Sequence, residues 1–361
     1  MISMALFNIK GRVGKTTLTY HLAHMLQRLG HRVLAVDLDP QANLTSLFLD
    51  EDSLAALWAE PESPAWGGTD TSGANALTIP LASRIQQDTG TVATSVKPIM
   101  EELGDVAFFE PSQVTDGLWL VPGDLELSAF EDRLSAAWPS TFTGDPAAIR
   151  TTTAFYRIIN DAARKVSADI VLIDVGPNLG AINRAALLAA DTVLVPLAAD
   201  LFSLRELRAL GPALRGWRST WQETVLPKVP SAVPAPSGAM KPIGYVIMQP
   251  LPRLDRPVRG YRRWLERIPQ VFTESMLAEP RDPDGRSYEL ATMRNYQSLM
   301  PLARDARKPM FDLKAADGAL GSTQSYVQKC RAEFRLLAES VLQRLNEVQR
   351  RGDHSDGREV P

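Results

Sequence analysis

The sequence predicts an α/β fold in which a mostly parallel sheet carries helices on both faces. Short apolar runs alternate with amphipathic helical stretches along most of the 361 residues, a pattern typical of a covered parallel sheet. Two of these runs end in aspartate, and a turn containing glycine and lysine joins the first run to the first helix. We expect one domain over residues 1–349 with an insertion at about 50–115, followed by a polar, disordered tail over 350–361.

The turn over residues 10–17 is a candidate phosphate site. It lies between the apolar residues 4–7 and a helical pattern over 18–29, in which leucine and methionine recur at steps of three and four. The first N–H groups of a helix have no partner inside it and point at whatever lies beyond its start. A phosphate bound there would accept hydrogen bonds from these groups.

The residue types in this turn suit a nucleotide with Mg²⁺. Gly11 and Gly14 let the backbone approach an anion without a Cβ in the way. We expect Lys15 to contact the β- and γ-phosphates and the Thr16 hydroxyl to be a Mg²⁺ ligand. A β–α turn with chance lysines is the alternative, which the agreement of strand, turn and helix disfavours. The residues expected to bind the nucleotide are Lys10, Gly11, Arg12, Val13, Gly14, Lys15, Thr16 and Thr17.

Two further apolar runs bring carboxylates to the same edge of the sheet. Residues 33–36 precede Asp37 and Asp39, and residues 170–173 precede Asp174. In an open α/β sheet, ligands bind at the carboxyl ends of the strands. We therefore expect Asp174 to hold Mg²⁺ through water. For Asp37 and Asp39, the alternative is a helix-capping turn.

The remaining pattern predicts further elements in chain order. The expected helices cover 54–58, 99–103, 125–138, 156–166, 183–190 and 202–214, the expected strands 117–121, 192–197 and 243–249, and an expected surface loop 226–241.

Charge is distributed unevenly along the chain. Residues 1–200 contain 13 basic and 24 acidic side chains, whereas residues 201–310 contain 18 and 10. Within the basic part, Arg259, Arg262 and Arg263 recur at helical spacing. Such a face can neutralise DNA phosphates without reading bases. The alternative is a solvated helix whose apolar residues, Tyr261, Trp264, Leu265 and Ile268, pack inward.

The C-terminal part predicts a long helix beginning near Ser322. Its apolar stripe consists of Val327, Cys330, Phe334, Leu337, Val341 and Leu345. Cys330 is the single cysteine, which excludes a disulfide within the chain. We find no apolar run long enough to cross a membrane and no signal-peptide pattern, so we expect a cytoplasmic protein without membrane contact.

These motifs together resemble the ParA/MinD family of ATPases. Residues 10–17 match its deviant Walker A motif, Lys-Gly-Gly-x-Gly-Lys-Thr-Thr, except that Arg12 stands where the family prefers glycine. Residues 37–41 resemble its switch I, Asp-x-Asp-Pro-Gln, and residues 174–178 resemble its switch II with Gly176 in place of a proline. The absence of a basic amphipathic tail favours the ParA branch.

The resemblance implies a P-loop NTPase that binds ATP and Mg²⁺ in a sandwich homodimer. In that dimer Lys10 reaches the partner's phosphates, Asp37 contacts the water shell of Mg²⁺, and Asp39 positions the attacking water. The implied catalytic residues are Lys10, Lys15 and Asp39, and the implied metal-site residues are Thr16, Asp37 and Asp174. The implied partners are nonspecific DNA and a ParB-like or other adaptor protein that stimulates slow hydrolysis during partition or positioning of a cargo.

Two other functions stay open at this point. The alternative is a ParA-like regulatory or defence-system subunit, whose ATP-bound dimer docks a protein partner with little hydrolysis, and the insertion at about 50–115 favours it mildly. A metabolic P-loop enzyme is the weaker alternative, and a reductase of that class would need cluster-binding cysteines, which a single Cys330 does not supply.

Overall fold

The computed structural model describes residues 1–11, 13–58, 90–248, 263–278, 287–294, 296 and 298–356, the last six without their side chains. Its centre is one eight-stranded sheet in the order β3-β4-β2-β5-β1-β6-β7-β8. Neighbouring strands are parallel except β3 and β4, which are antiparallel. The expected fold class is therefore confirmed. The strands are β1 (Ile2–Leu6), β2 (Val33–Asp37), β3 (Ser112–Thr115), β4 (Leu118–Val121), β5 (Ile170–Asp174), β6 (Thr192–Ala198), β7 (Lys241–Met248) and β8 (Glu289–Met293).

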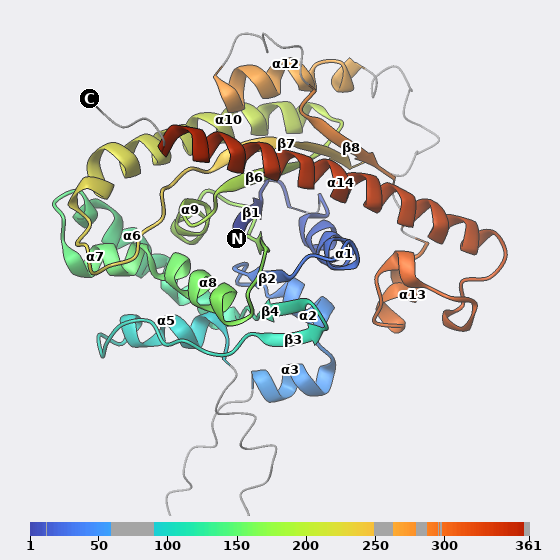
Figure 1. Ribbon diagram of the computed structural model, residues 1–361, viewed down its shortest axis with the longest axis horizontal. Coiled ribbons are helices and arrows are strands. Elements are labelled where there is room, and N and C mark those ends of the chain that lie inside the picture. Colours follow the sequence, from blue (N-terminus) through green and yellow to red (C-terminus); the bar gives the residue numbers. More distant parts are fainter. Residues whose placement is uncertain are drawn as a thin grey trace, which may run out of the picture.

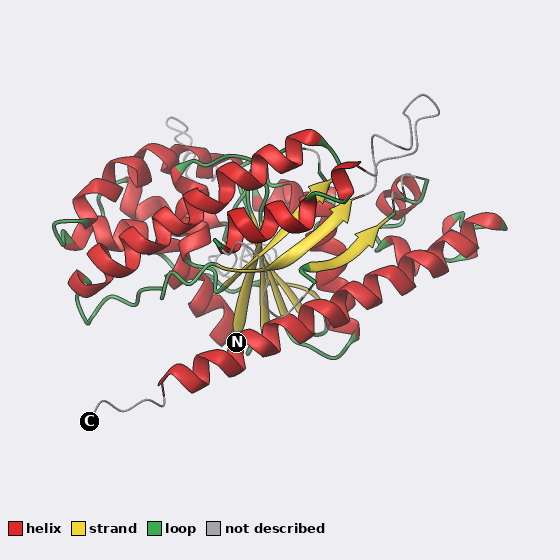
Figure 2. Cartoon of the chain, turned by 90° about the horizontal axis from the view of Figure 1, so that it is seen from above, coloured by secondary structure: helices red, strands yellow, loops and turns green. Residues whose placement is uncertain are grey.

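Helices cover both faces of this sheet (Figures 1 and 2). The helices are α1 (Lys15–Arg28), α2 (Asn43–Phe48), α3 (Glu51–Leu57), α5 (Val92–Met100), α6 (Phe130–Thr141), α7 (Pro146–Thr152), α8 (Ala154–Lys165), α9 (Ala181–Leu188), α10 (Leu201–Ser219), α12 (Ile268–Phe272), α13 (Met300–Asp305) and α14 (Ser322–Asp356). Short 3-10 or π segments are η1 (Leu125–Ala129), η2 (Thr220–Val225), η3 (Leu226–Lys228), η4 (Thr273–Leu277), η5 (Met310–Asp312) and η6 (Ala315–Asp317).

The central strands are buried on both faces, which explains their uninterrupted apolar sequences. Alternate side chains of each strand point to opposite faces, so one strand supplies two cores. In β1, Ala5 belongs to the hydrophobic core that contains residues of α5, α6, α8, α9 and α10, whereas Met4 and Leu6 belong to the core that contains residues of α1 and α14. The strands thereby fix the sheet between two helical layers.

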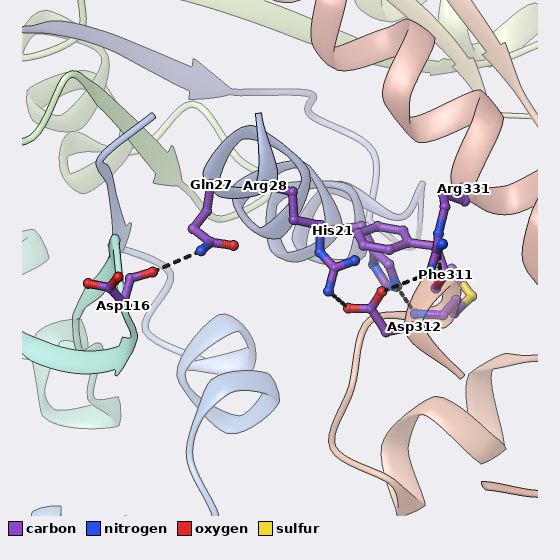
Figure 3. Close-up of polar contacts among 8 residues, drawn as sticks. His21, Gln27, Arg28, Asp116, Phe311, Asp312 and Arg331 are labelled. Carbon is purple, nitrogen blue, oxygen red and sulfur yellow. Dashed lines mark hydrogen bonds and ion pairs between the residues drawn. The ribbon is translucent and has the colours of Figure 1, made fainter. Parts of the chain in front are cut away.

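The expected stripe of α14 is confirmed. All six of its residues are buried against α1 and the sheet. Segment η5 lies between the two helices (Figure 3) and joins them: Arg28 and Arg331 both pair with Asp312, and the backbone N–H of Met310 donates to Nε2 of His21 over 3.1 Å. Helix α14 extends to Asp356, so its backbone enters the segment that we expected to be disordered from residue 350.

The sequence-based prediction for the segment around residue 99 is wrong. The helix there is α5, which begins seven residues earlier and ends at Met100. Its start is fixed by a capping box, in which the hydroxyl of Thr91 accepts from the Thr94 N–H over 3.2 Å and that of Thr94 accepts from the Thr91 N–H over 2.7 Å. The proline at position 98 lies two residues before the end of the helix, so it does not prevent the first two turns.

Part of the expected insertion belongs to the core. Val92, Val96 and Ile99 of α5 are buried in the same cluster as α6 and α8. After α5, the chain forms the edge strand β3, which the sequence analysis does not predict. Its residues are only partly buried or exposed, and three of the four are polar, so no apolar run marks the strand. Residues 59–89 lie outside the described part of the chain. The expected helix over 125–138 is the 3-10 segment η1 followed by α6. The other expected helices and strands are confirmed with shifts at their ends, among them α10, which extends to Ser219.

Candidate nucleotide and Mg²⁺ site

The turn between β1 and α1 has the geometry of an anion site. Gly14 is the residue before α1 and adopts φ +92°, a conformation that favours glycine. No side chain caps the start of α1, so its first N–H groups are open to a ligand. Gly11 is exposed and Val13 is buried at the ends of this turn, while Arg12 lies outside the described residues.

Lys15 is a buried cation beside this turn. Its Nζ donates to the backbone oxygen of Asn8 over 3.1 Å. Burial lowers the pKa of Lys15, and the nearby carboxylates Asp174, Asp39 and Glu206 partly oppose that shift. Within the described part of the chain, no ion pair of Lys15 is formed. The ammonium group can therefore meet a phosphate without first leaving a carboxylate.

The three expected carboxylates come together at the carboxyl edge. Asp37 and Asp174 are paired in register at the ends of β2 and β5, and both are fully buried. Asp39 is 7% exposed, and its Oδ1 accepts from the N–H of Gln41 over 3.0 Å. Burial raises the pKa of Asp174 to about 8 and that of Asp37 to about 6, and the charges of the neighbouring aspartates add to both shifts.

Thr45 is a site residue that sequence reasoning missed. Its N–H and its hydroxyl both donate to Oδ2 of Asp37, each over 2.8 Å. The same hydroxyl accepts from the N–H of Gly123 over 2.8 Å, and a Cβ on Gly123 would lie 2.9 Å from Cγ of Asp37. These contacts fix the carboxylate of Asp37. The only sequence signal is a threonine in the first turn of α2.

The residues present fit a Mg²⁺ ion that shares its coordination with phosphate and water. Oδ2 of Asp174 is buried without a hydrogen-bond partner among the described residues. Its Oδ1 accepts from the Thr19 hydroxyl over 3.4 Å, and the nearby Thr16 hydroxyl lowers the pKa of the same carboxyl against the effect of burial. Across the described ranges, no three His, Cys, Asp or Glu side chains are grouped to hold a metal alone. Mg²⁺ keeps several waters and prefers one or two carboxylates plus substrate phosphates, which this set matches.

Lys10 is held within its own chain. Its Nζ forms an ion pair with Oδ2 of Asp200 over 2.6 Å, and it lies 5.7 Å from the centre of the Phe202 ring. Asp200 also caps α10 by accepting from the N–H of Ser203 over 2.9 Å. Lys10 is expected to contact the phosphates of a partner subunit, and it would have to leave Asp200 to do so.

Of the candidate DNA residues, the structure describes only Arg263. Its side chain is exposed, and its guanidinium carbon lies 5.3 Å from the centre of the Trp264 ring. Trp264 and Leu265 pack against the core and Ile268 is buried, so this part of the expected apolar stripe is confirmed. Arg259 and Arg262 lie outside the described residues, as does Tyr261.

Comparison with known proteins identifies the family of the chain. A family model described as an AAA domain matches residues 1–225. The chain belongs to this family, as a ParA/MinD-type ATPase. It is 32% identical over 212 residues to a putative replication protein A of Rhizobium rhizogenes (57% of this chain, 43% of the relative). It is 29% identical over 207 residues to the chromosome-partitioning ATPase Soj of Thermus thermophilus (57% and 59%).

The chain spans about half the length of the curated relatives that it matches. A putative plasmid partition protein of Borrelia burgdorferi, solved with AMPPNP, matches the fold of this ParA-family chain. The TM-score is 0.55 at 17% identity, over 95% of this chain and 98% of that one. In the described part of the chain, no helix has the length and apolar character that a membrane span needs.

Proposed function

We propose that this ParA-family chain binds ATP with Mg²⁺ at the β1–α1 turn, closes into a homodimer around the nucleotide, and hydrolyses it slowly. The observation that supports this most is that Lys15 lies near the carboxylates of Asp174 and Asp39, at the edge of the sheet where Asp174 is paired in register with Asp37. Lys15 forms no ion pair among the described residues, and the phosphates of a nucleotide would supply the negative partner.

Each residue has a distinct role in this proposal. The N–H groups at the start of α1 and the Nζ of Lys15 bind the phosphates. Thr16, Asp37 and Asp174 hold Mg²⁺, which neutralises charge on the β- and γ-phosphates when it is bound. Asp39 forms no ion pair among the described residues and orients the attacking water. Lys10 of each subunit stabilises charge on the phosphate bound by its partner.

The dimer would act in partition or positioning of DNA or another cargo. The family relationship to the chromosome-partitioning ATPase Soj supports this role. In the proposal, the arginines at 259, 262 and 263 bind DNA without sequence preference, and a ParB-like or other adaptor stimulates hydrolysis in the cytoplasm.

The test is the size of the purified protein by light scattering with ADP and with ATP, each with and without DNA. We expect a monomer with ADP and a dimer with ATP. Lys15→Ala should abolish nucleotide binding, and Asp39→Ala should slow turnover while preserving the dimer. An ATP-bound dimer that binds a protein partner, but does not bind DNA and does not hydrolyse ATP, would contradict the proposal. That result would favour a docking subunit.

A further inference from the structure

Two side chains with no role in the proposed chemistry hold the turn that follows β5 by hydrogen bonds to its backbone and to the start of α9. This turn, residues 176–180, joins the Mg²⁺ carboxylate of Asp174 to the start of α9. Its position matters for the site, because a Cβ on Gly176 would lie 3.5 Å from Oδ1 of Asp39. A shift of this turn would therefore move the surroundings of Asp39.

Asn183 closes the turn from inside the first part of α9. Its amide nitrogen donates to the backbone oxygens of Gly176 and Asn178 over 2.9 and 2.8 Å, and it lies 3.0 Å from Oδ1 of Asn178. That same oxygen accepts from the N–H of Gly180 over 2.7 Å. Asn183 is 1% exposed and its bond to the Gly176 oxygen is buried, so water competes little with that bond, whereas the bonds at the exposed Asn178 are open to water.

Glu131 holds the other end of the turn from a different helix, α6. Its Oε1 accepts from the N–H of Ala181 over 2.6 Å, and its Oε2 accepts from the N–H of Ile182 over 2.9 Å. A carboxylate in this place satisfies two of the free N–H groups at the start of α9 and interacts favourably with the helix dipole. Arg184 stands over the ring of Trp138 in α6 at 4.5 Å, which packs the two helices together beside this contact.

We infer that Glu131 and Asn183 are positioning residues, which hold the 176–180 turn where Gly176 adjoins Asp39, so that turnover depends on them and nucleotide affinity does not. The inference rests on the proposed ATPase function. Among the described residues, no hydrogen bond joins either side chain to the 10–17 turn, so each acts through the backbone that it binds.

The test combines hydrogen exchange with steady-state kinetics in the full chain. Glu131→Gln keeps the size of the side chain but replaces one acceptor oxygen by a donor. In the protein without nucleotide, we expect several-fold faster exchange of the amides of Ala181 and Ile182. With ATP, we expect kcat to fall about tenfold, because small misplacements near reacting groups carry large costs, while KM and the affinity for a fluorescent ATP analogue stay within about twofold. Asn183→Ser, which keeps a single donor, should act in the same direction.

Asp132→Asn is the matched control, because Asp132 is the next residue of α6 and is exposed; it should change neither readout. Faster exchange with an unchanged kcat in Glu131→Gln would overturn the inference and leave Glu131 as a helix cap alone. Unchanged exchange would overturn it as well. Absence of turnover in the unsubstituted protein would instead contradict the proposed function, and the exchange experiment would still decide whether Glu131 and Asn183 fix the turn.

Discussion

At the scale of single residues, Lys10 has two competing partners. In one chain it pairs with Asp200, whereas the proposed dimer requires it at the partner's phosphate. Both side chains of this ion pair are about 30% exposed, at 31% and 28%, so water screens the pair and its contribution is about 0.2–1 kcal/mol. The ion pair between Lys10 and Asp200 within one chain is therefore weak enough for a phosphate to replace Asp200 as the partner of Lys10.

Asp200→Asn should strengthen ATP-dependent dimerisation by up to about 30-fold, because neither of the two Lys10 side chains of the dimer then leaves an ion pair worth up to about 1 kcal/mol. Asparagine remains a good N-cap, so α10 should start as before. The dimer dissociation constant is measured by sedimentation at several protein concentrations with ATP. Asp50→Asn, which changes the capping aspartate of α3, is the control. A weaker or unchanged dimer in Asp200→Asn would show that this pair does not oppose assembly.

Asp174 gives a second prediction, about pH. Its folded pKa is raised by burial to about 8, well above the usual value for aspartate. Between the unfolded and the folded pKa, the folded state binds more protons, so stability falls as pH rises from about 4 to about 8. Asp174→Asn removes the buried charge and should stabilise the nucleotide-free protein at pH 8 by at least about 1 kcal/mol.

The measurement is thermal unfolding of both proteins at pH 5, 6.5 and 8 without Mg²⁺ or nucleotide. The gain in melting temperature of Asp174→Asn should grow with pH, whereas Asp132→Asn should show no such trend. A variant that is less stable than the unsubstituted protein at pH 8 would mean that Asp174 carries no buried charge in the empty site.

At the scale of elements, the docking of α14 depends on one face of the helix. Leu337 is fully buried and the adjacent Leu336 is 63% exposed, so neighbouring residues of one type provide a matched pair. Leu337→Ala should lower the free energy of unfolding by about 2–5 kcal/mol through lost burial and the cavity left behind. Leu336→Ala should change it by less than about 0.5 kcal/mol. Urea unfolding followed by circular dichroism measures both, and equal effects would contradict the packing of α14.

The elements also show what sequence can and cannot predict. The helices α1 and α14 and the strands β1, β2 and β5 follow from periodicity and apolar runs, since their burial is regular over many residues. The start of α5 depends on two threonine hydroxyls, and a Thr-x-x-Thr spacing is too common to stand out. Within the site, Lys15 and the aspartates follow from motifs. The contacts of Lys10 with Asp200 and of Glu131 with α9 join residues 190 and 50 positions apart, so only the tertiary structure brings them together.

At the scale of the whole molecule, the chain divides its charge between its two halves. The acidic half contains the nucleotide turn and its carboxylates, and the basic half contains the arginines proposed to meet DNA. Binding to phosphates through several arginines releases counterions, so affinity should fall steeply with salt and should not depend on sequence. If the arginines act only in the dimer, DNA binding should also require ATP.

Replacing Arg262 and Arg263 together by alanine removes four arginines from the dimer. The change should therefore weaken binding of random duplex DNA at low salt by about tenfold or more, and should lower the slope of log affinity against log salt by up to about 4. Arg335→Ala, on the outer side of α14 where Arg335 is 63% exposed and pairs with Glu339, removes a basic group far along the chain and should leave both quantities unchanged. Fluorescence anisotropy of labelled DNA, with ATP and with ADP, measures them.

Equal DNA affinity with the two nucleotides would separate DNA binding from the nucleotide-driven dimer, because a dimer that presents its arginines together binds at two places at once and a monomer does not. If DNA affinity depends on ATP but does not fall in the double variant, other residues of the basic half must bind the DNA.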